Sequence, residues 1–163
     1  MPIDYIEIVF RFGVSVLIGC IIGLDRNLHG KPTGVKTLGL VALGACLVTM
    51  ASTNFMLINS AEEMSSASRV IQGVITGIGF LGAGVILHDE SNERVRGLTT
   101  AASIWVTAAI GIVCGMGFWK IAVIALVIVL MLFVIGRPLE RALHRHWLSK
   151  SKEEKDAISK HEE

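Results

Sequence analysis

Three glycines in the middle of the chain have the spacing of a nucleotide-binding turn. Gly77, Gly79 and Gly82 spell G-x-G-x-x-G, which in dinucleotide-binding folds lets the backbone approach a pyrophosphate. That chemistry requires the motif to follow a strand, to open a helix and to sit in a βαβ unit. Here the glycines lie inside residues 70–87, a run without any charged residue, and no βαβ alternation surrounds them. The motif therefore predicts no cofactor site, and the glycines need another explanation.

A set of charged and hydroxyl residues at the edges of the apolar runs is the better candidate for a binding site. We name it the polar mouth, and it consists of Asp25, Arg26, Lys36, Arg94, Arg96, Thr99 and Thr100. The two segments that carry these residues are both expected on the cytoplasmic side, where they would form a basic, glycine-lined pocket for a phosphate-like anion or a lipid headgroup. The alternative is that the basic residues only set the topology of the chain.

A stripe of hydroxyl side chains continues from this mouth into an apolar run. Thr99, Ser103 and Thr107 recur every four residues and so share one face of a helix. Hydroxyls in such positions either bond the carbonyl four residues earlier in their own helix or line a polar path. The second possibility keeps a transporter or channel for a cation or small solute as the competing hypothesis.

The residue types that carry catalysis or bind metals are missing from the apolar runs. The runs after residue 36 contain no carboxylate, although Mg²⁺ sites usually use one or two. Cys20, Cys46 and Cys114 have no C-x-x-C spacing, and the histidines lack partners at metal-site spacing apart from the weak pair His144 and His146. No phosphate-binding G-x-x-x-x-G-K-[ST] motif occurs. We therefore expect no enzyme, no cofactor, no metal site and no nucleic-acid partner.

The elements that must position these residues are membrane-spanning helices. Hydrophobic residues make up 52% of the 163 residues and charged residues only 18%. A helix needs about 20 mostly apolar residues to cross a bilayer. The sequence therefore predicts an all-α, five-helix transmembrane domain over residues 1–136. Its spans are expected at residues 5–24, 37–58, 70–87, 97–116 and 118–136.

The loop charges predict how these spans are oriented. Most of the 15 Lys and Arg residues lie in the first loop, in the third loop or after residue 136. The positive-inside rule puts those segments in the cytoplasm and the N-terminus outside. Residues 137–148 are expected to form a basic amphipathic helix on the inner leaflet, and residues 149–163 a disordered polar tail. At the other end, Asp4, Glu7 and Arg11 share one helical face and form either an interfacial anchor, which we favour, or an entry site for a cation.

Pairs of glycines four residues apart predict close packing between helices in the bilayer. The pairs are Gly19 with Gly23, Gly73 with Gly77, and Gly111 with Gly115, and the third span adds Gly79, Gly82 and Gly84. We expect the third span at the centre of the bundle, and the glycine faces to support a homodimer or contact with another membrane protein. The alternative is that the glycines unwind the third helix and expose carbonyls to an ion.

Three ordered blocks of the sequence resemble the MgtC/SapB family of bacterial inner-membrane proteins. They are IGCIIGLDRNLHGKPTGVKTLGLVALGA, GVITGIGFLGAGVIL and VRGLTTAASIWVTAAIGIVCG, and they lie within residues 17 to 117. The family pattern usually has Glu where this chain has Asp25, Arg where it has Lys36, and His where it has Leu38. A role that needs an imidazole at position 38 is therefore not carried over.

The resemblance implies a multi-pass bacterial inner-membrane protein with a role linked to low magnesium and, in some pathogens, to survival inside host cells. It also implies modulation of other membrane proteins, including ATP synthase, and not transport of magnesium itself. Longer members carry a cytoplasmic C-terminal domain. We expect this chain of 163 residues to be a short form that lacks it.

Overall fold

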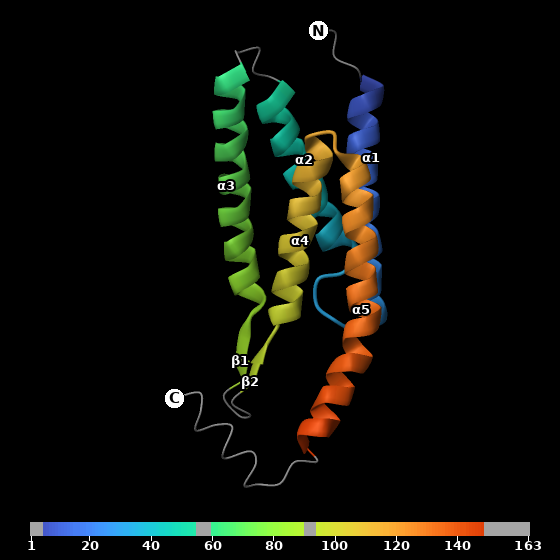
Figure 1. Ribbon diagram of the computed structural model, residues 1–163. Helices are drawn as coiled ribbons and strands as arrows, with labels where there is room; N and C mark the ends of the chain where they lie inside the picture. Colours follow the sequence, from blue (N-terminus) through green and yellow to red (C-terminus); the bar gives the residue numbers. More distant parts are fainter. Residues whose placement is uncertain (1–4, 55–59, 90–93, 149–163) are drawn as a thin grey trace. The chain divides into compact units, whose positions relative to one another are not determined.

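The structure, a computed structural model, describes residues 5–54, 60–89 and 94–148. The outer part of the second predicted span (55–58) and the predicted polar tail (149–163) lie outside these residues. Five helices account for most of the described chain (Figure 1). They are α1 (Tyr5–Leu28), α2 (Val35–Asn54), α3 (Ser60–Val85), α4 (Leu98–Gly115) and α5 (Trp119–Leu148), and two short strands, β1 (Leu87–Asp89) and β2 (Arg94–Arg96), lie between α3 and α4.

All five helices are long and apolar enough to cross a membrane. The qualifying windows are Tyr5–Leu28, Val35–Ser52, Ala67–Val85, Leu98–Gly115 and Trp119–Gly136. Large apolar side chains remain exposed on the outside of the helices, among them Ile6, Phe80 and Leu132. Exposed apolar surface on this scale suits lipid rather than water. The chain is therefore a multi-pass membrane protein, with every span formed by helix.

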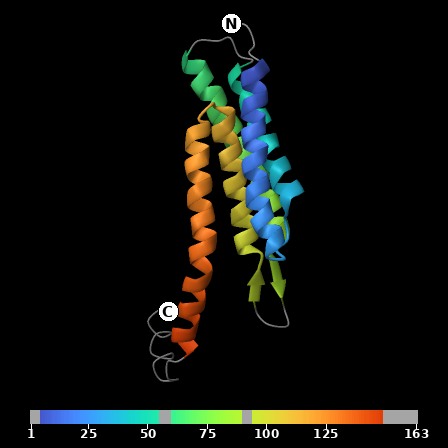
Figure 2. The ribbon, with the colours of Figure 1, turned by 90° about the vertical axis from the view of Figure 1, so that its right-hand side faces the viewer.

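The chain divides into two compact units, residues 1–126 and residues 127–163. In the first unit, α2 and α4 pack on each other, α1 packs on both, and α3 contacts both. Figures 1 and 2 show α1 and α3 flanking the α2–α4 pair. The core between these helices includes Ile18, Ile22, Leu38, Cys46 and Ile104.

This arrangement corrects one expectation about the glycine-rich third helix. We expected α3 at the centre of the bundle because glycines cover most of its circumference. Instead, 11% of the α3 window is buried and 56% of the α4 window, so α4 is the more central helix. Small residues allow close approach but do not require it, and here other helices hold the central places. Unwinding is also absent from the described residues of α3, which are continuous helix from Ser60 to Val85.

The connection from α3 to α4 contains a small antiparallel ladder where the sequence indicated only a loop. Leu87 pairs with Arg96, His88 with Val95 and Asp89 with Arg94. Gly97 follows the ladder with a φ of 93°, a left-handed conformation that favours glycine. A Cβ at Gly97 would also lie 2.9 Å from the carbonyl carbon of Val85. Glycine therefore lets the chain leave the ladder and enter α4 close to the end of α3.

The second unit is described by itself, and its described part is the continuation of α5 from Val127 to Leu148. The sequence predicted a span over residues 118–136 and a separate basic amphipathic helix over residues 137–148. The structure has no break, and Pro138 lies inside the helix. A change from apolar to charged side chains alters the solvent that a helix prefers but does not by itself end the helix. Placement of residues 137–148 on a membrane surface stays a prediction.

Candidate functional site

The polar mouth has a buried arginine at its centre. Arg26 lies in the last turn of α1 and is 3% exposed, and its guanidinium donates a hydrogen bond to the hydroxyl of Thr100 in the first turn of α4. Thr100 is itself 3% exposed. Arg26, which the sequence placed in the first loop, and Thr100, which it placed at the start of the fourth span, are therefore in direct contact. This contact ties the end of α1 to the start of α4.

Backbone geometry at both helix ends explains why Arg26 can reach α4. The α1 helix ends in a Schellman motif, in which the N–H of Gly30 bonds the carbonyl of Asn27 and the N–H of Lys31 bonds that of Arg26. Gly30 has the left-handed φ of 60° that this motif requires. At the start of α4, Gly97 supplies no side-chain cap. The guanidinium thus lies beside a helix N-terminus, and both features favour negative charge nearby.

The other residues of the polar mouth lie on the elements that meet at this end of the bundle. Asp25 forms an ion pair with His29, with 3.4 Å between Oδ1 and Nδ1, when the imidazole is protonated. Lys36, Arg96 and Thr99 are exposed. The side chain of Arg94 lies outside the described residues. The structure therefore joins Arg26 to Thr100 directly, and an anion or lipid headgroup as the ligand of this mouth stays a prediction.

Asn27, near the mouth, was not singled out from the sequence. A Cβ at Gly34 would lie 2.7 Å from the amide carbon of Asn27, so the loop before α2 packs on the Asn27 side chain. Leu38, where the family pattern has His, is 0% exposed, and its side chain belongs to the core. An asparagine near a glycine loop is a weak signal in a sequence, because it does not indicate which glycine it contacts.

The hydroxyl stripe of α4 is directed at its own helix. Ser103 donates to the carbonyl of Thr99 and Thr107 donates to that of Ser103, each at 2.7 Å. Ser103 and Thr107 are 4% and 0% exposed, whereas Thr99 is exposed. Hydroxyls that bond the i−4 carbonyl have already satisfied their donor within the helix. Within the described residues, Ser103 and Thr107 are therefore buried between the helices of the first unit, and Thr99 is the member of the stripe that reaches the surface.

Four of the predicted glycines contact α2 from two sides. On α1, a Cβ at Gly19 would lie 2.6 Å from the Leu38 carbonyl oxygen, and one at Gly23 would lie 2.6 Å from the Cα of Val35. On α4, a Cβ at Gly111 would lie 2.9 Å from that of Ala45, and one at Gly115 2.7 Å from the Cys46 carbonyl oxygen. No side chain fits at these positions without movement of backbone. The G-x-x-x-G pairs of α1 and α4 hold the bundle together.

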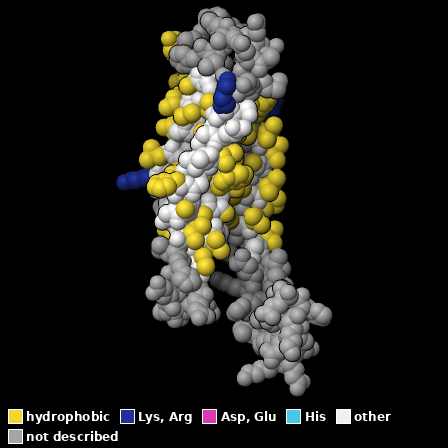
Figure 3. Space-filling view, turned by 90° about the vertical axis from the view of Figure 1, so that its left-hand side faces the viewer, with side chains coloured by type: hydrophobic (Ala, Val, Ile, Leu, Met, Phe, Trp, Pro, Cys, Tyr) yellow, Lys and Arg dark blue, Asp and Glu magenta, His cyan; other side chains and the backbone are white. Residues whose placement is uncertain are grey.

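The glycines of α3 have no such neighbours. Within the part of the chain that the structure describes, no atom lies within 4 Å of a Cβ built at Gly73, Gly77, Gly79 or Gly84, and Gly82 meets only the Cβ of Ala101, at 3.7 Å. Gly73, Gly77 and Gly84 share one side of the helix with Phe80, which is 82% exposed. We call these four residues the α3 glycine face. Figure 3 views the molecule from the side on which α3 lies in Figure 1 and shows a white strip of backbone and non-hydrophobic side chains beside yellow hydrophobic ones.

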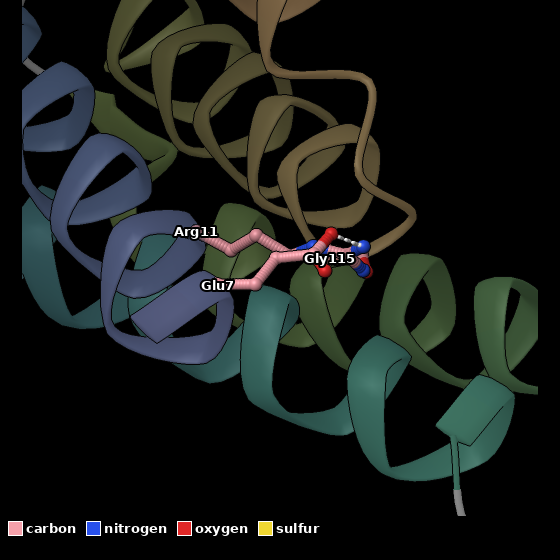
Figure 4. Close-up of polar contacts among 3 residues, drawn as sticks. All are labelled: Glu7, Arg11 and Gly115. Atoms are coloured by element: carbon pink, nitrogen blue, oxygen red, sulfur yellow. Dashed lines mark hydrogen bonds and ion pairs between the residues drawn. The ribbon is translucent and has the colours of Figure 1, made fainter. Parts of the chain in front are cut away.

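Arg11 does not have the role that we favoured for it. Its side chain is 17% exposed, donates to the carbonyl oxygen of Gly115 at 3.0 Å, and forms an ion pair with Glu7 (Figure 4). An outward-pointing anchor would be exposed to headgroups, so the anchor interpretation is wrong. Glu7 is bound to Arg11, which also argues against a cation-entry site there.

The described residues contain no group of three His, Cys, Asp or Glu side chains that could hold a metal ion. Cys46 and Cys114 are buried and Cys20 is partly buried, and all three are free thiols. Ser15 donates to the carbonyl of Ala42 at 2.9 Å inside the α1–α2 contact. These buried groups contribute to packing between helices.

Five helices that are long and apolar enough to cross a membrane define a multi-pass membrane protein, and its buried arginine lies where α1 and α4 meet. The MgtC family profile matches residues 12–142, and the chain belongs to the MgtC family. No solved structure matches the chain significantly.

Three relatives illustrate the similarity. Protein SrpB of Synechococcus elongatus is 38% identical over 91% of this chain and 83% of its own length. Protein SapB of Bacillus subtilis is 39% identical over 77% of this chain, and protein MgtC of Salmonella typhimurium is 36% identical over 80%. The alignments span 54% of the SapB chain and 53% of the MgtC chain, so this chain corresponds to about half of each.

Proposed function

We propose that this chain is a non-enzymatic protein of the bacterial inner membrane, linked to magnesium limitation, that modulates other membrane proteins through helix packing. Its N-terminus lies outside and its C-terminus in the cytoplasm. The link to magnesium is supported by membership in the MgtC family. The orientation is supported by the basic residues of the first and third loops and of the tail.

The open α3 glycine face carries the part of this proposal that concerns packing. Helices in lipid associate by close packing, and the glycines of α1 and α4 are already in contact with α2. Those of α3 are exposed, so they are free to receive a helix from another chain. A surface of this kind suits a protein that acts by contact with another helix.

A second copy of this chain fits the α3 glycine face. Phe80 projects from the same side of α3 as Gly77 and Gly84. The face therefore carries both a large projecting side chain and a flat surface on which the same side chain of another copy can pack. A surface that is complementary to itself suits a two-fold dimer. Gln72 lies beside this face, is exposed, and its side-chain amide makes no hydrogen bond within the described chain. An amide both donates and accepts, so two copies of Gln72 can satisfy each other.

A growth assay tests the proposal in cells. In a host that lacks its own family member and is starved of magnesium, the wild-type chain should restore growth, and the Gly73→Leu/Gly77→Leu variant should not. Gly13→Leu is the matched control, because Gly13 is also exposed on a helix with no described atom within 4 Å of its Cβ position. Equal growth with the α3 variant and with wild type, at equal protein levels, would refute a role for this face.

Transport remains the competing function and has its own test. Purified protein in liposomes with a trapped magnesium indicator should show no saturable influx. Influx that disappears in Ser103→Ala/Thr107→Ala would make the hydroxyl stripe a path and would overturn the regulator proposal.

A further inference from the structure

The side of the bundle opposite the polar mouth contains a partly buried cation that neither the packing of glycines nor the proposed function uses. Arg11, on α1, donates from Nη1 to the carbonyl oxygen of Gly115, 104 positions away in the sequence. Its Nη2 pairs with Glu7, one turn earlier on α1. Its Nε is buried and has no hydrogen-bond partner within the described residues. These contacts indicate that the guanidinium of Arg11 has a structural role where α1 meets the end of α4.

The carbonyl that Arg11 binds is the one left over at the end of α4. The helix ends in a Schellman motif, in which the N–H of Phe118 bonds the carbonyl of Val113 and that of Gly117 bonds the carbonyl of Cys114. The N–H of Met116 donates to the carbonyl of Ile112. The Gly115 carbonyl receives no backbone N–H among these bonds. Arg11 supplies the missing donor, and its positive charge is favourable at a helix C-terminus.

The turn between α4 and α5 is shaped around the guanidinium. Gly117 has a φ of 88°, and a Cβ there would lie 2.9 Å from Nη2 of Arg11. Two residues further on, Trp119 at the start of α5 packs edge-to-face on Phe10, with ring centroids 5.6 Å apart. Phe10 is the neighbour of Arg11 in the sequence. Adjacent residues of α1 therefore contact the end of α4 and the beginning of α5.

We propose that Arg11, Glu7, Gly115 and Gly117 form a latch, which we call the Arg11 latch, that fastens the α4–α5 turn to α1. Arg11 is a positioning residue that caps α4 from another helix, and Glu7 holds its guanidinium in place. Gly117 is the residue that leaves room for it. When the latch opens, the last turn of α4 loosens and the start of α5 separates from α1. This device is independent of the α3 glycine face and of what that face binds.

Cys114 is a natural reporter of this opening. It is 0% exposed, lies in the last turn of α4 beside Gly115, and is a free thiol. Cys20 is also free and lies away from the turn, against the start of α2, where its thiol is 4.0 Å from the Val35 carbonyl oxygen. Labelling with N-ethylmaleimide in liposomes, read at each cysteine by peptide mass spectrometry, therefore separates local opening from general unfolding.

The latch predicts that Arg11→Met raises the labelling rate of Cys114 by about tenfold or more, because a charge-assisted hydrogen bond is lost. The rate at Cys20 should stay within about twofold of wild type, because Cys20 lies away from the turn that the latch holds. Glu7→Gln should give a smaller rise, because the bond to Gly115 remains. Arg69→Met, at an exposed arginine of α3, is the matched control and should change neither rate.

A double-variant cycle tests whether Gly117 belongs to the latch. Gly117→Ala strains the turn whether or not Arg11 is present. The contribution of this strain to labelling therefore cancels when the double variant is compared with the two single variants. The fold-increase in the Cys114 labelling rate should be smaller in Arg11→Met/Gly117→Ala than the product of the fold-increases in the two single variants. Unchanged labelling of Cys114 in Arg11→Met, an equal rise at Cys20, or a double variant that equals the product would each overturn the proposal.

Discussion

The contrast between the two sets of glycines gives a prediction in which one chemical change has different effects on stability at two positions. A methyl group is added by Gly111→Ala on α4 and by Gly77→Ala on α3. At Gly111 the new Cβ would lie 2.9 Å from the Cβ of Ala45 and closer still to the carbonyl oxygen of Ala42. At Gly77 no described atom lies within 4 Å of the new Cβ. The two variants have the same gain in helix propensity and differ in packing alone.

The size of the effect follows from these distances. Restoring ordinary contact with the backbone carbonyl oxygen of Ala42 requires α4 to move away from α2 by about 1 Å, so the upper part of the roughly 1–3 kcal/mol range for overpacking applies. Alanine offsets up to about 1 kcal/mol of that through its higher helix propensity. We therefore expect Gly111→Ala to lower the free energy of unfolding by on the order of 1–2 kcal/mol. Gly77→Ala should leave it unchanged or raise it by up to about 1 kcal/mol.

Thermal unfolding in detergent, followed by circular dichroism, measures this difference. The protein is kept dilute enough to be monomeric, so that contacts between chains do not contribute. In a chain of this size, 1 kcal/mol corresponds to a shift in Tm of roughly 2–4 °C. Gly111→Ala should therefore unfold at a lower temperature than wild type, and Gly77→Ala should not. A Tm that is unchanged in Gly111→Ala, or lowered equally in both, would refute the assignment of the two glycine sets.

Other substitutions test the remaining contacts in the same unfolding assay. Arg26→Met removes the donor to Thr100 at the polar mouth and should cost on the order of 1–3 kcal/mol, whereas Lys36→Met, at an exposed cation of the same mouth, should cost less than about 0.5 kcal/mol. Leu38→Ala should cost about 2–5 kcal/mol, because the side chain is fully buried, and a Tm close to wild type would contradict its place in the core. Ser103→Ala should change stability by less than about 1 kcal/mol, since its hydroxyl bonds only its own helix, and a larger loss would point to an interaction outside that helix.

The sequence predicted the helical character of the chain well because one strong signal, length of apolar run, decides it. The G-x-x-x-G pairs of α1 and α4 also identified residues that contact another helix. Glycine spacing does not indicate which helix is the partner. For that reason the glycine-rich α3 was expected at the centre of the bundle. A small residue permits close approach from any side, and the partner depends on how all the helices fit together.

The contacts that the sequence did not predict are those between residues far apart in the chain. The bond from Arg11 to Gly115 joins two helices through a backbone carbonyl, which has no sequence signature. Arg26 and Thr100 were both expected at the polar mouth, but burial of the arginine was not foreseen, because a charge near a helix end is usually exposed. The β1–β2 ladder was missed because strands of three residues have too few side chains to show alternation.

The most direct test of the proposed role of the α3 glycine face is association in a bilayer. Two populations of the chain, labelled with a donor and an acceptor dye, are mixed in lipid vesicles, and energy transfer is followed as lipid is added. Wild type and Gly13→Leu should show transfer that falls on dilution, as for a reversible dimer. Gly73→Leu/Gly77→Leu and Phe80→Ala should show much less transfer at every dilution. Transfer in the α3 variants equal to that of wild type would contradict the account, because the face would then be no interface between copies.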